Sequence, residues 1–142
     1  MLRRLKYLGA SQNDLLDVYI KQVRSLAEFA VPAWNSSLTG DDIVNLEQIQ
    51  KTALHIILGQ EYKSYNSALK TTGLDKLSER RKKICIKFAK RAQKHPKFSK
   101  WFKLNSKRNT RLPQPKFCPP VYRTDRFRKS PLCYLTTLLN SM

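Results

Sequence analysis

Residues 39–59 read TGDDIVNLEQIQKTALHIILG, and this stretch has the pattern of one amphipathic helix with both ends marked. Thr39 and Asp42 have the spacing of a capping box at a helix start, and Gly59 can adopt the positive φ that often ends a helix. One face carries apolar residues at steps of three and four: Ile43, Leu46, Ile49, Ala53, Ile56 and Ile57. Because a helix of about twenty residues is marginal alone in water, neighbouring segments must cover this face.

Helices are expected on both sides of this stretch. Ser11 and Asp14 form a second capping-box pair, and an apolar face then continues until Pro32: Leu15, Tyr19, Val23, Leu26 and Ala30. A short helix is expected from Ser64 to Thr72. A longer one, capped by Asp75 and ended by Pro96, has its apolar residues at Leu77, Ile84, Cys85, Phe88 and Ala92. The pattern predicts an all-α fold, a small antiparallel helical bundle.

The sequence also suggests boundaries. Residues 1–10 are expected to be the remnant of a preceding helix or linker, and residues 11–95 the helical domain. Residues 96–142 are expected to form a basic, largely extended tail, because residues 112–131 hold five of the seven prolines. The pair Ser130-Pro131 predicts a short terminal helix.

The positive charge is concentrated in one part of the chain. The net charge is +18, yet residues 1–79 hold nine lysines and arginines and nine acids. Residues 80–129 hold nineteen lysines and arginines against one acid, Asp125. Such segregation is typical of chains that bind a polyanion, so nucleic acid is the first candidate partner and an anionic membrane surface the second.

The cysteine spacing and the hydropathy of the sequence indicate the cellular location of the protein. Cys85, Cys118 and Cys133 are an odd number with wide gaps, which favours neither a disulfide framework nor a paired-cysteine zinc site. No segment has the roughly twenty apolar residues that a membrane span needs. We expect an intracellular protein of the nucleus or cytoplasm, with no membrane partner.

Several segments, in order, resemble the C-terminal part of LINE-type (non-LTR retrotransposon) reverse transcriptases. They are RRLKYLGAS, DLLDVYIKQVRSLAEFAVPAWNSSLT, LEQIQKTALHIILG, YNSALKTTGLDKLSERRKKICIKFAKRA and YRTDRFRKSPLCYLTTLLN. The resemblance implies a thumb-like helical domain over residues 11–95, which packs beside the primer and template duplex. It also implies that the endonuclease and the polymerase fingers and palm lie in a part of the parent protein that this chain lacks.

The family's metal-binding palm motif is absent from the sequence. That motif is an aromatic residue, any residue and two aspartates, whereas Asp41 and Asp42 follow Thr39 and Gly40 and read as first-turn acids of a helix. We therefore expect no polymerase activity from this chain, although the parent polyprotein would be an RNA-directed DNA polymerase.

Other catalytic and metal sites are not indicated either. The ten acids are spread along the chain, and two-metal phosphoryl transfer needs carboxylates that converge. A zinc site of His95, Cys118 and Cys133 would lack a fourth ligand and the usual short spacing. His55 and His95 have no serine or cysteine partner in a recognisable motif. We expect no catalytic residue, no metal and no cofactor.

The predicted helix over residues 75–95 offers one candidate binding surface. Lys83, Lys87, Lys90 and Lys94 are separated by four, three and four residues and fall on one side of a helix, with Arg80 and Arg91 nearby. The lysines would follow phosphates of a duplex without reading sequence, or they form an ordinary solvated face. Residues 80–83, RRKK, also fit a loose nuclear-import pattern, for which a structural or phosphate-facing role is the alternative.

The tail offers a second candidate surface. It interleaves aromatic rings with cations, a mixture that suits stacking on unpaired bases: Tyr122, Arg123, Arg126, Phe127, Arg128 and Lys129. The alternative is that Tyr122 and Phe127 anchor the tail on the protein's own core. Both surfaces predict a non-catalytic protein that binds RNA, DNA or an RNA/DNA hybrid. The other hypotheses are an autonomous ribosome- or chromatin-associated module and a degenerate mobile-element fragment without function.

Overall fold

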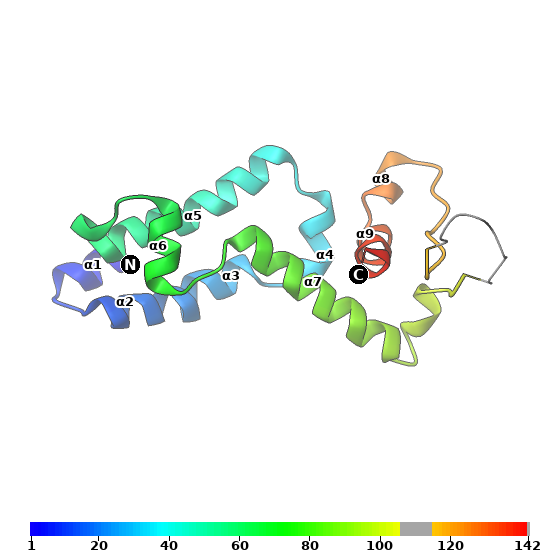
Figure 1. Ribbon diagram of the computed structural model, residues 1–142, viewed down its shortest axis with the longest axis horizontal. Coiled ribbons are helices and arrows are strands. Elements are labelled where there is room, and N and C mark those ends of the chain that lie inside the picture. Colours follow the sequence, from blue (N-terminus) through cyan, green and yellow to red (C-terminus); the bar gives the residue numbers. More distant parts are fainter. Residues whose placement is uncertain (106–114, 142) are drawn as a thin grey trace. The chain divides into compact units, whose positions relative to one another are not determined.

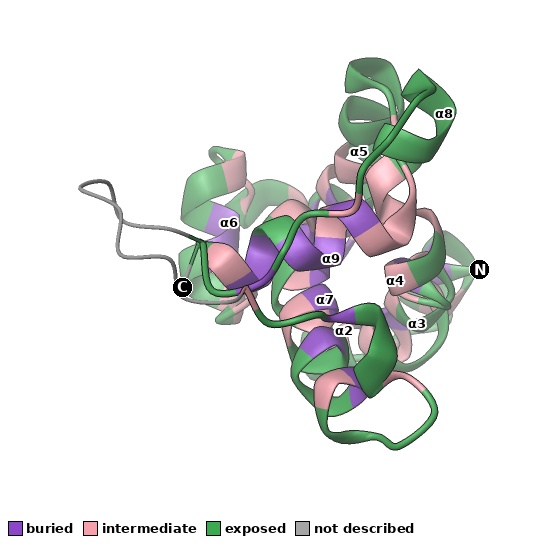
Figure 2. Cartoon of the chain, turned by 90° about the vertical axis from the view of Figure 1, so that its right-hand side faces the viewer, coloured by how far each residue is buried: buried purple, intermediate pink, exposed green. Residues whose placement is uncertain are grey.

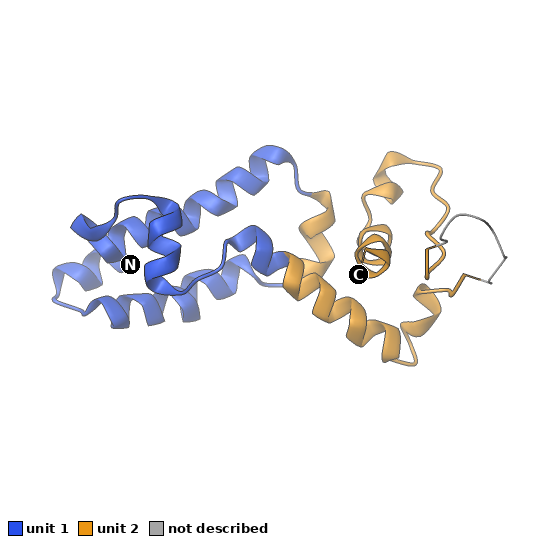
Figure 3. Cartoon of the chain, viewed as in Figure 1, with its two compact units in different colours: residues 1–29, 38–81 blue, residues 30–37, 82–142 orange. Residues whose placement is uncertain are grey.

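The computed structural model describes residues 1–105 and 115–141, and these residues form an all-α fold, as expected (Figure 1). No strand forms among them, and two residues, Leu104 and Phe117, make an isolated antiparallel bridge. The chain divides into two compact units (Figure 3). Unit 1 comprises residues 1–29 and 38–81, and unit 2 comprises residues 30–37 and 82–142. The boundaries expected at residues 10 and 95 do not coincide with this division.

Unit 1 is built around α5. Its elements are α1 (Leu2–Tyr7), α2 (Gln12–Val18), the π-helical turn η1 (Tyr19–Arg24), α3 (Ser25–Ala27), α5 (Gly40–Leu58), the 3₁₀ turn η3 (Gly59–Glu61), α6 (Tyr65–Thr72) and the first turn of α7 (Leu77–Lys94). Leu2 of α1 is buried with Leu15, Tyr19, Ala53 and Ile57. Residues 1–10, expected to be the remnant of a preceding helix or linker, thus contain the helix α1, and Leu2 of this helix belongs to the core.

Both ends of α5 are closed as the sequence predicts, and a lysine adds a further cap. The Thr39 hydroxyl accepts from the Asp42 amide at 3.2 Å, and the Asp42 carboxylate accepts from the Thr39 amide at 3.0 Å. Gly59 ends the helix with a φ of +58°. At the same end the Lys6 ammonium donates to the Ile56 carbonyl at 2.5 Å, where a cation complements the helix dipole.

The buried face of α5 differs from the expected one. Ile43 and Ile49 are 40% and 42% exposed, whereas Gln50 and Leu54 are fully buried. The Tyr19 hydroxyl donates to Gln50 Oε1 at 3.1 Å, and Gln50 Nε2 donates to the Asp75 carbonyl at 2.9 Å. These bonds satisfy the buried amide, so a polar residue turns inward where apolar periodicity predicted an isoleucine.

The expected helix from Ser11 to Pro32 is also altered. Its capping box is present, but residues 19–24 form a π-helical turn and the helix ends at Ala27. A π turn adds a residue to the helical repeat and so shifts the register of the residues after it. Leu26 is consequently 77% exposed, and Ala30, with a φ of +51°, turns the chain into the helix α4 (Val31–Trp34).

The start of α7 is capped from another helix. The Glu47 carboxylate, on α5, accepts from the backbone amides of Leu77 and Ser78 at 3.2 Å each, and from the Tyr65 hydroxyl. A carboxylate at this position satisfies free amides and complements the positive end of the helix dipole. The desolvation of the Tyr65 ring, followed by its hydrogen bond to Glu47, raises the pKa of the Tyr65 hydroxyl.

Unit 2 contains the rest of α7 and five further elements. These are α4 (Val31–Trp34), the 3₁₀ turn η2 (Asn35–Ser37), the 3₁₀ turn η4 (Ser99–Trp101), α8 (Asp125–Arg128) and α9 (Pro131–Asn140). Its core includes Val31, Cys85, Ala89, Phe102, Phe117 and Leu135. Stripes of buried residues run along both α7 and α9 (Figure 2).

The α7 stripe differs from the predicted one at Phe88. Leu77, Cys85 and Ala92 are buried as expected, but Phe88 is 37% exposed while Ala89 is fully buried. Phe88 and Trp101 instead line an apolar cavity of about 470 Å³ in unit 2. Cys85 and Ala89 belong to the same core cluster as Leu135, Leu138 and Leu139 of α9.

The segment after Pro96 is more structured than expected. Asn140 of α9 accepts from the Phe117 amide at 2.9 Å and donates to the Phe117 carbonyl at 3.0 Å, which fixes Phe117 in the core of unit 2. The expected extended tail is also interrupted by α8, whose first turn is capped by Thr124. The terminal helix predicted from Ser130-Pro131 is confirmed as α9. Residues 106–114 of the expected extended tail lie outside the described residues.

Candidate nucleic-acid interface

The excess positive charge of the protein lies almost entirely in unit 2. Unit 2 holds seventeen lysines and arginines and one acid, Asp125, whereas unit 1 holds eleven against nine acids. Asp125 Oδ1 is 3.2 Å from the Arg128 guanidinium, so the single carboxylate of unit 2 is already paired within the tail. Unit 2 can therefore approach a polyanion with little internal neutralisation.

The predicted row of lysines is present on α7. The helix is continuous from Leu77 to Lys94, and the row's four members, Lys83, Lys87, Lys90 and Lys94, are all exposed. Since successive residues are about 100° apart around the axis, these lysines lie within about 60° of one another. Cys85, Ala89 and Ala92 are buried on the opposite side. We call these four residues the lysine row.

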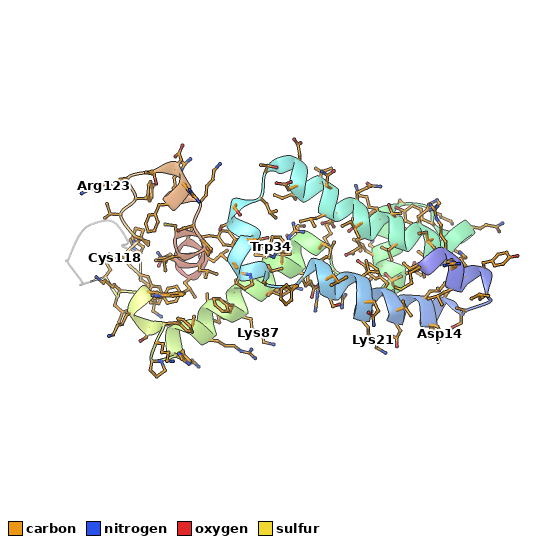
Figure 4. The ribbon with its side chains drawn as sticks, turned by 180° about the vertical axis from the view of Figure 1, so that it is seen from behind. Asp14, Lys21, Trp34, Lys87, Cys118 and Arg123 are labelled. Carbon is orange, nitrogen blue, oxygen red and sulfur yellow. The ribbon has the colours of Figure 1, made fainter. Side chains whose placement is uncertain are left out.

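The lysine row is not neutralised by carboxylates along most of its length. Lys87, Lys90 and Lys94, and Arg91 beside them, make no ion pair with any residue in the described part of the chain. Figure 4 shows Lys87 projecting away from the body of unit 2. A row of this kind spans about 16 Å, because an α-helix rises about 1.5 Å per residue. This geometry fits contacts to successive phosphates.

Arg80 does not join this surface. Its Nε is 2.5 Å from Glu28 Oε1, and Arg24 Nε is 3.4 Å from the same oxygen, so Arg80 is part of an ion-pair cluster in unit 1. Arg81 is only 3% exposed. The RRKK run over residues 80–83 is therefore partly structural, because Arg80 is ion-paired with Glu28 and Arg81 is buried.

The tail residues form a second basic surface in unit 2. Six of them are exposed: Tyr122, Arg123, Arg126, Phe127, Arg128 and Lys129. Tyr122 and Phe127 are 51% and 41% exposed, so neither is the buried anchor that the alternative interpretation required. Figure 4 shows Arg123 and Lys87 on opposite sides of α9. The structure thus does not bring the tail and the lysine row together into one continuous surface.

Sequence reasoning missed the hydroxyl groups that lie beside the tail. Ser36, Ser37 and Ser130 line a cavity with Arg126 and Lys129. Ser36 and Ser37 are far from these cations along the chain, and no spacing rule links them. Only the packing of η2 and α4 against α9 places them together.

The described residues contain no group of three histidine, cysteine, aspartate or glutamate side chains that could hold a metal ion. Cys85 and Cys133 are buried free thiols, and Cys118 is an exposed one. None of the helices in the described ranges is long and apolar enough to cross a membrane. Comparison of the chain with protein-family models, with characterised proteins and with solved structures finds no match.

Proposed function

We propose that this protein binds the phosphate backbone of RNA, DNA or an RNA/DNA hybrid through the lysine row of α7, without catalysing a reaction. The observation that supports this most strongly is the placement of the row. Lys87, Lys90 and Lys94 are exposed on one side of a helix whose opposite side is buried, in a unit with one acid. Lysines so arranged are held at a fixed spacing by the core beneath them.

We expect the affinity for nucleic acid to depend strongly on salt concentration and only weakly on base sequence. Each lysine that contacts a phosphate releases condensed counterions, which lowers the affinity as salt rises. Lysine ammonium groups directed at phosphates do not contact base edges, so nucleic acids of different sequence should bind with similar affinity. The tail provides a separate basic surface on the other side of α9, where aromatic rings accompany the cations.

We further propose that the chain is a thumb-like fragment of a LINE-type reverse transcriptase. Support comes from the order of sequence segments between residues 3 and 140 that resemble that family, together with the all-α fold. The proposal predicts an in-frame palm motif, an aromatic residue and two adjacent aspartates after one intervening residue, encoded upstream of Met1. A flanking sequence with its own promoter and no such motif would favour the autonomous-module hypothesis.

The binding proposal is tested by fluorescence anisotropy with a labelled RNA strand, an RNA/DNA hybrid and a DNA duplex. We expect the logarithm of the association constant to fall linearly with the logarithm of salt concentration between about 50 and 200 mM, with a slope of about −3 or steeper. Two unrelated sequences of equal length should bind within about threefold of each other. An affinity that is independent of salt would contradict the proposal.

A further inference from the structure

Two adjacent cavities of unit 2 have the features of a small-ligand site. The first, about 440 Å³, we call the serine cavity, and it is lined by Ser36, Ser37, Thr124, Arg126, Phe127, Lys129, Ser130 and Pro131. The second, about 280 Å³, we call the tyrosine cavity, and it is lined by Ser36, Pro119, Pro120, Tyr122, Arg128, Lys129, Cys133, Tyr134 and Thr137. Both cavities include Ser36 and Lys129, so they adjoin each other.

The serine cavity contains two buried hydroxyl groups without a partner. The Oγ atoms of Ser36 and Ser130 are inaccessible to solvent and make no hydrogen bond with any residue in the described ranges. Buried polar atoms in proteins are nearly always hydrogen-bonded, because an unsatisfied one loses its interaction with water. These two atoms, from η2 and from the N-cap of α9, belong to residues that line one cavity, and rotation about the Ser χ1 bonds is needed before a ligand there can bond to them.

The surroundings of these hydroxyl groups favour an anion. Arg126 and Lys129 line the same cavity, are exposed, and make no ion pair within the described part of the chain. Ser130 is the N-cap residue of the ten-residue helix α9, so the positive end of the helix dipole lies at this cavity. A phosphate group accepts hydrogen bonds from hydroxyls, guanidinium and ammonium groups at once, and matches this set of donors.

The tyrosine cavity has a different lining that suits a flat ring. Pro119, Pro120 and Tyr122 provide apolar faces, and the Tyr134 hydroxyl accepts from Asn35 Nδ2 at 3.0 Å. Aromatic side chains of this kind stack on unpaired bases with little preference for the base. Lys129 lies on both cavities, so a ligand with a phosphate in one can place a ring in the other.

We propose that the two cavities bind one unpaired nucleotide, with its phosphate in the serine cavity and its base against Tyr122 and the prolines of the tyrosine cavity. The nucleotide belongs to a single-stranded part of the nucleic acid that the lysine row contacts, and in this respect the inference rests on the proposed function. The chemistry of the cavities themselves does not depend on the lysine row.

Isothermal titration of the full chain with uridine 5′-monophosphate, uridine and inorganic phosphate tests the cavities directly. We expect the monophosphate to bind at least about tenfold more tightly than uridine, because uridine lacks the charged acceptor. It should also bind more tightly than inorganic phosphate, which lacks the ring. Equal binding of the monophosphate and uridine, or of the monophosphate and phosphate, would overturn the proposal.

Two double variants locate the site. Ser36→Ala/Ser130→Ala should weaken monophosphate binding about threefold to tenfold, and Arg126→Gln/Lys129→Gln about tenfold or more. The matched control is Lys100→Gln/Lys103→Gln, which removes two exposed cations that line neither cavity and should change the affinity less than about twofold. Affinity that falls equally in the control and the cavity variants would overturn the assignment.

The effect of the serine variant on folding and its effect on binding of a nucleic-acid strand are measured separately. Because the two serine hydroxyls have no partner in the folded chain, the serine double variant should melt at the same temperature as the wild type or higher. It should also weaken binding of a short oligouridylate, and unchanged oligouridylate affinity would overturn the placement of a strand in the site. If the monophosphate binds and no RNA does, the proposed function fails while the cavities remain a nucleotide site.

Discussion

Arg80 Nε lies 2.5 Å from Oε1 of Glu28, an acid that is only 14% exposed. This ion pair assigns the first arginine of the RRKK run to the scaffold of unit 1, while the lysine row begins three residues later in unit 2. Residues close together in a basic run thus have different roles, because the Glu28 carboxylate pairs with Arg80, whereas Lys87, Lys90 and Lys94 make no ion pair in the described part of the chain.

Arg80→Gln should separate these roles. The Arg80 side chain is 39% exposed, so solvent screening limits its loss to about 1 kcal/mol or less of unfolding free energy. The salt slope of RNA binding should not change, since Arg80 does not contact the phosphates. Lys87→Gln is the matched control, and it should lower the magnitude of the slope by about 0.9. A slope change in Arg80→Gln equal to that in Lys87→Gln would place Arg80 at the interface.

Glu47→Gln should destabilise unit 1. The carboxylate accepts from the amides of Leu77 and Ser78 and from the Tyr65 hydroxyl, using both oxygens. In glutamine one of these oxygens becomes an NH2 donor, so at least one of the three bonds is lost and the others are weakened. We expect a loss of about 1–2 kcal/mol in urea unfolding. Glu79→Gln removes the same charge from the exposed first turn of α7, and its free energy of unfolding should fall by only about 0.3 kcal/mol. Equal losses in the two variants would show that charge alone, and not the cap, is responsible.

The Thr39–Asp42 capping box should make stability depend on pH at the acid end. The side-chain hydrogen bond to Thr39, and then the backbone one, lower the pKa of Asp42 below its usual value of 3.8. As pH falls, the Asp42 carboxyl is protonated at a higher pH in the unfolded chain than in the folded one. The carboxylate therefore stabilises the folded state above pH 3.8, and this stabilisation is lost as pH falls through the folded-state pKa.

The difference in stability between the wild type and Asp42→Asn should therefore shrink as the pH is lowered through this range in denaturant titrations. Asp41→Asn is the control, because Asp41 is in the same first turn and takes no part in the capping box. A difference for Asp42→Asn that stays constant down to the lowest pH would contradict the capping role.

Two helix starts could be predicted from sequence, whereas the helix end expected at Pro32 was wrong and the buried faces could be predicted only in part. Capping boxes at Ser11 and Thr39 depend on residues three apart, and both form as expected. The buried faces depend on distant partners. Gln50 is buried because Tyr19 and the Asp75 carbonyl bond to it, and Leu26 is exposed because a π turn shifts the register before it. Neither effect leaves a periodic signal.

The candidate site shows the same division. The lysine row is a periodic feature of one helix, so the spacing of Lys83, Lys87, Lys90 and Lys94 was enough to predict it. The serine and tyrosine cavities combine η2 with residues of the tail and α9. No local pattern could have linked Ser36 to Ser130, because only the packing within unit 2 brings them together.

The most direct test of the proposed function compares two triple variants of equal charge. Lys87→Gln/Lys90→Gln/Lys94→Gln and Lys63→Gln/Lys70→Gln/Lys76→Gln each remove three exposed lysines, from unit 2 and unit 1 respectively. In anisotropy titrations of RNA across the salt range, we predict that the first variant lowers the magnitude of the log–log slope by about 2–3 and the second by less than about 0.5. Equal slopes for the two variants would show that net charge, and not the lysine row, binds the nucleic acid, and would contradict this conclusion.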